Sequence, residues 1–543
     1  MADFGQLIHL TIVRQFQRAS GNLLTSGASP TGGIAETAAI TGKSGGEPLI
    51  TRRGLLAGLL AGVALPSLAE VMETSPRPVP RPNVSGDTGA AGLSAEMADL
   101  IVAAKLGGAV SYVLVDAATG AVLEARQPDL KLPPASVAKA VTSLYALDRL
   151  GAGYRFATRV LATGPVQAGI VQGDIVLAGG GDPTLQTDQL GDLVARLADK
   201  GITGATGRFL YWDGALPALE GISADQPAHV GYNAAISGLN LNFNRVYFEW
   251  KRENGDWKVA IDARGERFLP EVEMVRVAVA TRDAPLFTYD RGQVEEWTVA
   301  SGALGKGGSR WLPVRDPGRY VAEVFRTLAR AQGIKLPLAD RTAAQPTGTE
   351  LARMESEPLT EVLRDMLRYS TNLTAECVGL TASGLSGLEA SGRAMSDWVR
   401  ATFGVSFDMR DHSGLGGASR VTAAGMVKVL VAAEKAQRGL KPILRDVGMK
   451  DDKGAVIEGH PVKVRAKSGT LNFVSGLAGH ISPPPTSGNG GRELVFAIFS
   501  GDPERRDAVP VGEREEPEGS SSWNKRARRL QGQLVSRWAG AYG

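Results

Sequence analysis

The chain has 543 residues, too many for one ordinary domain, and its apolar fraction of 43% with 22% charged residues is that of a folded globular protein. A formal net charge of +3, with basic and acidic residues intermixed, gives no reason to expect nucleic-acid binding. The single cysteine, Cys377, excludes an intramolecular disulfide and is expected to be a buried apolar residue. The five histidines are scattered, so no metal or other cofactor is expected.

Residues 1–69 have the layout of an N-terminal extension with an export signal. Arg52 and Arg53 precede a short apolar run at 54–65, and small residues follow up to Ala69, where a signal peptidase would cut. The arginine pair resembles a twin-arginine signal. Because the apolar run is shorter than the ~20 residues of a membrane span, we expect export to the periplasm and no transmembrane span. A short buried helix is the alternative interpretation of this run.

A linker and the first part of a folded domain come next. Residues 70–92 are rich in Pro, Ser and Gly and predict an extended linker. The domain's first part is expected at 93–158. It opens with two strands, at 110–116 and 121–126, which predict a hairpin.

The segment 133–139, Pro-Pro-Ala-Ser-Val-Ala-Lys, places Ser136 at the start of a predicted helix. Apolar residues at three- and four-residue steps make one buried stripe there: Val137, Ala140, Val141, Leu144, Leu147 and Leu150. Lys139 lies one turn after Ser136 on the same face. A Ser hydroxyl is a weak nucleophile until a base takes its proton, and a Lys is such a base where burial lowers its pKa. A surface Ser and Lys is the commoner explanation of such a motif alone.

Residues 159–345 predict an inserted, mostly β region of one or two domains. Short β-like runs alternate there with Gly, Asp and Pro turns, at 159–162, 174–177, 208–212, 245–250, 257–261 and 273–280. Helical spacing is found only at 188–199 and 320–332.

The domain's second part is expected at 346–543, and helical spacing returns there at 359–369. That helix ends in a second motif, Ser370-Thr371-Asn372, and helical segments continue to about 436. Alone, this motif is typical of any loop that ends a helix.

A third motif, Lys467-Ser468-Gly469-Thr470, precedes two strand-like runs at 473–481 and 493–500. These runs predict a hairpin that begins with the motif. The polar tail at 502–522 is expected to be loose. A final helix then places its apolar residues on one face: Trp523, Ala527, Leu530, Leu534, Val535 and Trp538. Packing on the sheet is the expected role of that face, with a membrane-surface anchor as the alternative.

Together and in this order, the three motifs resemble the active site of the penicillin-binding proteins and serine β-lactamases. Three further segments resemble the D-alanyl-D-alanine carboxypeptidase/endopeptidase family, the class C low-molecular-mass group with a large insertion between the first two motifs. They are Gly179-Gly180-Gly181-Asp182-Pro183-Thr184-Leu185, Asn240-Leu241-Asn242-Phe243-Asn244, and Asp411-His412-Ser413-Gly414-Leu415 followed by Ser419-Arg420. The resemblance covers roughly residues 93–500.

The resemblance implies an α/β fold: a transpeptidase-like domain with an antiparallel sheet flanked by helices, a helical subdomain, and inserted mostly-β domains. It implies a periplasmic serine peptidase that acts on peptidoglycan stem peptides. Ser136 would attack the penultimate D-alanine carbonyl, Lys139 would take its proton, Ser370 would relay a proton, and Asn372 would bind the side of the substrate. Substrate binding would fall to the third motif, with Lys467 favouring the terminal carboxylate: Lys467, Ser468, Gly469 and Thr470. β-Lactams would acylate the same serine.

Two departures from the family pattern stand out. Ser468 replaces the commoner Thr but keeps a hydroxyl, and His412 stands where the family more often has Gly, which puts a tight turn there in doubt. A β-lactamase and a non-catalytic penicillin-binding scaffold remain alternatives. Carboxypeptidase and endopeptidase action are not separated at this point, since both cut after a D-centre with the same groups.

Overall fold

The computed structural model describes residues 88–451, 454–488 and 490–543. The expected export signal and most of the expected linker therefore lie outside the described residues. Within them, folded structure begins with a helix at Thr88, a few residues before the position expected from composition. No helix in the described part of the chain combines the length and the apolar character that crossing a bilayer requires.

The central element is a six-stranded antiparallel sheet with the order β17-β18-β19-β20-β1-β2. Its strands come from both ends of the described chain: β1 (Ala109–Asp116), β2 (Val122–Arg126), β17 (Arg445–Asp446), β18 (Lys463–Leu471), β19 (Val474–Ser482) and β20 (Leu494–Gly501). β1 pairs with β20 along its whole length, from Ala109 opposite Gly501 to Asp116 opposite Leu494. The segments before and after the large insertion therefore build one domain.

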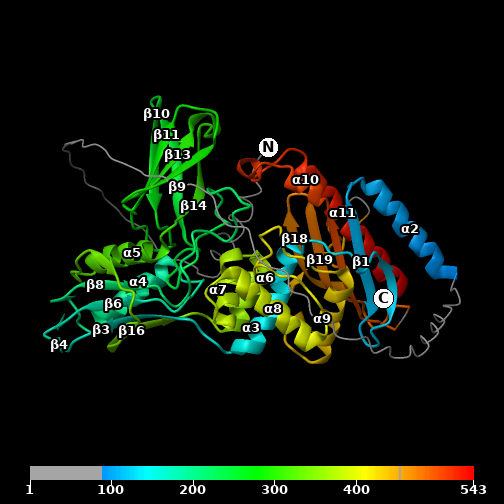
Figure 1. The fold of residues 1–543 in the computed structure, drawn as a ribbon, viewed down its shortest axis with the longest axis horizontal. Coiled ribbons are helices and arrows are strands. Elements are labelled where there is room, and N and C mark those ends of the chain that lie inside the picture. Colours follow the sequence, from blue (N-terminus) through cyan, green and yellow to red (C-terminus); the bar gives the residue numbers. More distant parts are fainter. Residues whose placement is uncertain (1–87, 452–453, 489) are drawn as a thin grey trace, which may run out of the picture. The chain divides into compact units, whose positions relative to one another are not determined.

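Helices cover both faces of this sheet (Figure 1). On one face α11 (Ser520–Tyr542) packs against β19, β20 and α2 (Thr88–Ala104). The predicted apolar face of α11 is buried there, including Trp523 and Trp538, which confirms the prediction that this helix packs on the sheet.

The other face carries the helical subdomain, which is built from α3 (Ala138–Leu150), α6 (Leu359–Tyr369), α7 (Asn372–Ser383), α8 (Leu388–Phe403) and α9 (Ala423–Lys435). The apolar stripe predicted on α3 lies mostly inside this core, with Val141 and Leu144 fully buried. Because α3 packs against α6, α7 and α8, the segment that carries Ser136 is held between the sheet and the subdomain.

Three sheets occupy most of the region between α3 and α6. A five-stranded sheet has the order β15-β8-β6-β3-β16, with the bounds β3 (Ala157–Ala162), β6 (Ile175–Ala178), β8 (Phe209–Trp212), β15 (Ala339–Arg341) and β16 (Thr349–Glu355). Two helices contact it, α4 (Thr187–Asp199) and α5 (Pro317–Ala331), and both were predicted from their spacing.

Two three-stranded sheets follow in the same region (Figure 1). One is built from β9 (Arg245–Glu253), β10 (Asp256–Asp262) and β14 (Gly307–Pro313), the other from β11 (Val275–Ala280), β12 (Phe287–Arg291) and β13 (Glu295–Ala300). A small sheet of two-residue strands completes it: β4 (Val166–Gln167), β5 (Ile170–Val171) and β7 (Gly204–Ala205). The six short β-like runs expected here correspond to β3, β6, β8, β9, β10 and β11. The remaining strands of the region were not predicted: β4, β5, β7, β12, β13, β14, β15 and β16.

The two runs after the third motif form the predicted hairpin, since β19 pairs antiparallel with β20. Two other predictions about the C-terminal part were wrong. The third motif does not begin that hairpin but lies inside a further strand, β18, which pairs with β19 and extends the hairpin to a three-stranded meander. The tail at 502–522 is not loose: it forms α10 (Pro503–Asp507) and the short turn Val511–Glu513. Its charged residues have partners, since Glu515 accepts bonds from His229 Nε2 at 2.5 Å and from Arg310 at 2.9 Å.

Candidate active site

Ser136 lies in a single 3₁₀ turn, Ala135–Val137, that leads into α3. The preceding Ala135 has a φ of 45°, a left-handed conformation that is unusual for a residue with a Cβ. This turn contacts β18 and β19. Backbone strain of this kind is held in place only where the surroundings are tightly packed. The turn therefore fixes the Ser136 hydroxyl at the edge of the central sheet.

Lys139 is completely buried and its Nζ donates three hydrogen bonds. The acceptors are Ser136 Oγ at 2.9 Å, Asn372 Oδ1 at 2.7 Å and the Ser413 carbonyl at 2.8 Å. Burial lowers the pKa of Lys139 to about 7, although Glu376 and Asp411 oppose the shift. Near neutral pH a large fraction of this amine is therefore unprotonated and able to accept a proton from Ser136.

The second motif connects α6 to α7. Ser370 ends α6 in the left-handed conformation, with a φ of 59°, and its Oγ accepts a hydrogen bond from Lys467 Nζ at 3.0 Å. Asn372 is the first residue of α7. Its amide is fixed at both ends, because Oδ1 accepts from Lys139 and Nδ2 donates to the Tyr232 carbonyl at 3.0 Å. The insertion thus contributes a backbone group to the site.

The third motif lies where β18 passes the Ser136 turn. Lys467 is buried, and its Nζ donates to Ser370 Oγ and to the Ser468 carbonyl at 2.8 Å. Burial first, and the positive charge of Lys139 second, lower the pKa of Lys467 well below the usual range. Gly469 lies against the turn, since a Cβ there would lie 2.7 Å from the Pro134 carbonyl oxygen and 2.8 Å from Ser136 N. Glycine is therefore required at this position by the close approach of two backbones.

Residues 467–471 also present an open strand edge. β17 pairs with β18 only at Arg465 and Ala466, so among the described residues no strand continues the ladder beyond that point. Ser468 is half-buried and Thr470 is exposed on this edge. An unpaired strand edge beside a nucleophile can take an extended peptide as an additional strand.

The loop 411–416 packs against Lys139, whose Nζ donates to the Ser413 carbonyl. The Asp411 carboxylate accepts from the N–H groups of Gly414 at 2.8 Å and Gly416 at 2.7 Å. The close contact between backbones is at Gly414, which has a φ of 73°. An added Cβ at this position would lie 1.9 Å from the Ala135 carbonyl oxygen. Glycine is therefore needed at 414 and not at 412, which removes the doubt raised by the departure from the family pattern.

His412 itself occupies a buried pocket. Its Nε2 bonds Ser391 Oγ at 2.6 Å, and burial lowers the pKa of the ring to about 3. Gly379 on α7 makes room for it, since a Cβ there would lie 2.1 Å from the imidazole. The space that the His412 ring occupies therefore depends on glycine at position 379.

All eight residues expected at the site lie in the Ser136 turn, in α3, at the junction of α6 and α7, or in β18. Sequence reasoning missed Glu376, Tyr232 and the role of Asp411. A charged residue inside the mostly apolar run 373–380 is the signal that could have found Glu376.

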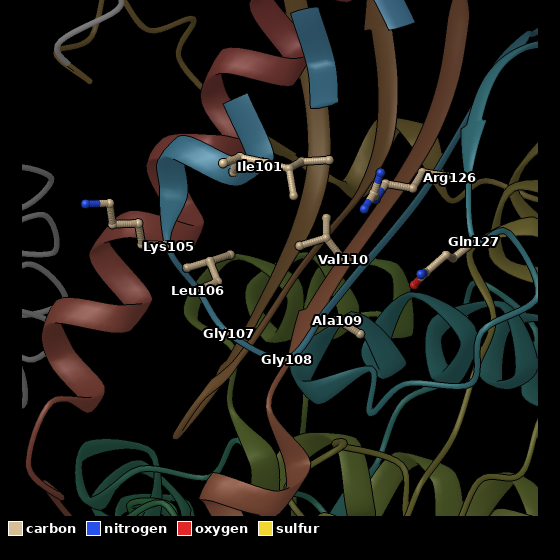
Figure 2. A pocket seen from close by; sticks show the side chains of 10 residues that line it. Ile101, Lys105, Leu106, Gly107, Gly108, Ala109, Val110, Arg126 and Gln127 are labelled. Atoms are coloured by element: carbon tan, nitrogen blue, oxygen red, sulfur yellow. The ribbon is translucent and has the colours of Figure 1, made fainter. Parts of the chain in front are cut away.

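Other features of the described part of the chain offer no competing centre. No group of three or more His, Cys, Asp or Glu side chains within it could hold a metal ion. A hollow of about 370 Å³ lies between the end of α2 and strands β1 and β2 (Figure 2). None of the expected site residues lines it, and its lining includes Ile101, Lys105, Leu106, Val110 and Arg126.

Comparisons with known proteins agree with this geometry. Residues 93–514 match the model of the D-Ala-D-Ala carboxypeptidase 3 (S13) family. A D-alanyl-D-alanine carboxypeptidase from Actinomadura is 28% identical over 436 residues, which cover 73% of this chain and 78% of the relative. A carboxypeptidase from Mycobacterium tuberculosis is 27% identical over 477 residues, 80% of this chain and 88% of the relative.

Among solved structures, penicillin-binding protein 4 of Haemophilus influenzae has a similar fold. It superposes with a TM-score of 0.66 at 20% identity and covers 82% of this chain and 99% of its own. The α/β fold with additional β-sheets is therefore shared with that protein. The same relative has been solved in complex with a β-lactam.

Proposed function

The chain belongs to the D-Ala-D-Ala carboxypeptidase 3 (S13) family, and from that premise we propose that it hydrolyses the bond after a D-alanine in peptidoglycan stem peptides. The reaction would proceed through an acyl-enzyme on Ser136. The observation that carries the proposal is the hydrogen bond of 2.9 Å between Ser136 Oγ and the buried amine of Lys139. It joins a nucleophile to a base whose pKa lies near neutrality.

Acylation begins when Lys139 accepts the Ser136 proton and the oxygen attacks the carbonyl carbon. The negative charge on the former carbonyl oxygen would be stabilised by the backbone N–H groups of Ser136 and Thr470. Each donor of this kind contributes about 3–4 kcal/mol of barrier reduction. The close packing of Gly469 against Ser136 supports this assignment, because it brings β18 next to the Ser136 N–H.

Collapse of the intermediate breaks the C–N bond, and the proton that Lys139 took from Ser136 passes to the leaving amine, so that Lys139 is neutral again. Ser370, whose hydroxyl accepts a hydrogen bond from Lys467 Nζ, would relay this proton. Lys139 then takes a proton from the water that attacks the ester, and the Ser136 oxygen leaves with that proton. Lys467, together with the hydroxyls of Ser468 and Thr470, would favour a substrate with a free C-terminal carboxylate.

A β-lactamase needs a carboxylate that activates the deacylating water. The two buried carboxylates beside Lys139, on Glu376 and Asp411, accept hydrogen bonds from the backbone N–H groups of loop 411–416 instead. The structure therefore favours the peptidase. Because the relative from Haemophilus influenzae is found with a bound β-lactam, we expect penicillins to acylate Ser136 as stable substrate mimics.

The test is digestion of purified muropeptides, followed by mass analysis. Loss of a terminal D-alanine identifies a carboxypeptidase, and conversion of dimers to monomers identifies an endopeptidase. A Ser136→Ala variant is the control and should show neither product. Unchanged muropeptides with the wild type would contradict catalysis and favour a scaffold that only binds penicillin.

The place of action is part of the proposal. The arginine pair at 52–53 supports export to the periplasm, where the substrate lies. Replacing both arginines by lysine should leave an unprocessed precursor in the cytoplasm. Normal processing of that variant would contradict the twin-arginine route and leave the peptidase assignment untouched.

A further inference from the structure

Two buried carboxylates lie behind Lys139, and none of the proposed steps uses them. Glu376 is completely buried on α7, one helical turn after Asn372, and Asp411 is 4% exposed. Burying a carboxylate is costly unless it is hydrogen-bonded and compensated in charge. Their positions therefore call for a function in the site.

Glu376 holds the backbone that contacts the base. Its Oε2 accepts from His412 N at 3.0 Å and its Oε1 accepts from Ser413 N at 2.8 Å. The carbonyl of the same Ser413 accepts from Lys139 Nζ at 2.8 Å. Two of the three acceptors of Lys139 thus depend on α7: the Asn372 side chain directly, and the Ser413 carbonyl through Glu376.

The charge of Glu376 acts on Lys139 as well. Burial favours the neutral amine, whereas Glu376 first and Asp411 second favour the ammonium form. Burial and the neighbouring Asp411 raise the pKa of Glu376, whereas its attraction to the Lys139 ammonium opposes that rise. Because burial and the carboxylates shift the pKa of Lys139 in opposite directions, this amine can both accept a proton and release it.

Other titratable groups near this pair come from the insertion, loop 411–416, α7 and β18. From the insertion, the buried carboxyl of Asp182 acts on Cys377, and burial raises its pKa. His412 from the loop is neutral because burial lowers its pKa. Cys377 on α7 is a neutral thiol whose pKa burial raises. From β18, Lys467 contacts Ser370, and the positive charge of Lys139 helps to lower its pKa. Lys139 is therefore the cation that these carboxylates face.

We propose that Glu376 is a positioning residue for acylation, a role that rests on the proposed function of Ser136 and Lys139. It holds the Ser413 carbonyl against Lys139 Nζ and stabilises the ammonium that forms when the Ser136 proton moves to that nitrogen. If Glu376 only held loop 411–416 in place, its hydrogen bonds would be sufficient. Its negative charge has a second effect that can be measured separately, because it changes the pH at which Lys139 titrates.

The experiment measures the rate constant of acylation by a fluorescent penicillin between pH 5 and pH 10. Glu376→Gln keeps the size of the side chain and removes its charge. We expect a 10- to 100-fold slower acylation. The acid limb of the profile should move about one pH unit lower, since the ammonium of Lys139 loses a favourable charge. Glu376→Asp keeps the charge and should restore the wild-type midpoint.

Two further variants keep the test decisive. Ser391→Ala removes the bond to the His412 ring on the same loop without changing charge, and should leave the midpoint at its wild-type value. If Glu376→Gln does not fold, Asp411→Asn carries the test, and its midpoint should move in the same direction. A midpoint that stays unchanged in a folded, charge-free variant overturns the proposal, and so does an unchanged rate.

Failure of the proposed function would look different. A wild type that forms no adduct with penicillin removes the premise, and no profile can then be measured. A wild type labelled on Ser136, together with a Glu376→Gln variant of unchanged midpoint, removes only the role of Glu376.

Discussion

The contact between Gly469 and the Ser136 turn gives the sharpest quantitative prediction. An added Cβ at 469 would lie 2.7 Å from the Pro134 oxygen, 2.8 Å from Ser136 N and 2.9 Å from Val137 N. All three are backbone atoms, so no side chain can rotate away. The shortfall from an ordinary contact of 3.4 Å is about 0.7 Å, and β18 has to move outward by roughly that distance. Misplacement on this scale costs roughly 30- to 100-fold in rate, or about 2–3 kcal/mol.

The assay is the acylation rate constant of Gly469→Ala with labelled penicillin, measured beside its thermal unfolding. Gly153→Ala is the matched control, because a Cβ there meets no atom within 4 Å and its φ is not left-handed. We expect the control to acylate at the wild-type rate. A folded Gly469→Ala protein that acylates within twofold of wild type would refute the reasoning that β18 and the Ser136 turn must lie this close.

The remaining predictions concern three titratable side chains. Lys467→Ala should lose activity on all peptides, because Lys467 also holds Ser370, and the loss should be larger on peptides with a free C-terminal carboxylate than on amidated ones; equal losses on both, measured as kcat/KM, would contradict a carboxylate role. Since the pKa of Lys139 is lowered to about 7, acylation should rise through neutral pH and level off above it, and a flat rate between pH 5 and pH 8 would argue against a lysine base. The pKa of His412 is lowered from 6.5 to about 3, so its contribution to stability is complete above pH 6.5 and is lost as the pH falls towards 3, by up to about 5 kcal/mol. A His412→Gln variant should unfold with a shallower loss of stability over that range, and an identical pH dependence in urea unfolding would count against this assignment.

The elements that position the site were largely predictable, because they depend on local patterns. The stripe on α3 and the face of α11 repeat at helical spacing; the first is mostly buried and the second is buried, as that spacing predicts. The resemblance to the family allowed the active site to be predicted, because it rests on all three motifs in their order. No single motif would have supported that prediction. The register of β18 was not predictable, since a Lys-Ser-Gly-Thr run has no alternation to mark it as a strand interior.

The contacts that could not be predicted from the sequence are hydrogen bonds between residues far apart in the chain. The partners of Lys139 lie 233 and 274 residues away in the chain. Glu515 in the supposedly loose tail bonds His229, 286 residues before it. A polar composition indicates solvent exposure only when such partners are absent, and nothing local reveals them. The matched pair of His412 and Gly379 is another case, because its two residues come from a loop and from a helix.

The central claim is that one hydroxyl, activated by a buried lysine, carries the acyl group. The most direct measurement is peptide mapping by mass spectrometry after reaction of the purified protein with penicillin. The account predicts a single adduct on the peptide that contains Ser136, and none after Ser136→Ala. An adduct on any other residue, or one that persists in the Ser136→Ala protein, would contradict it.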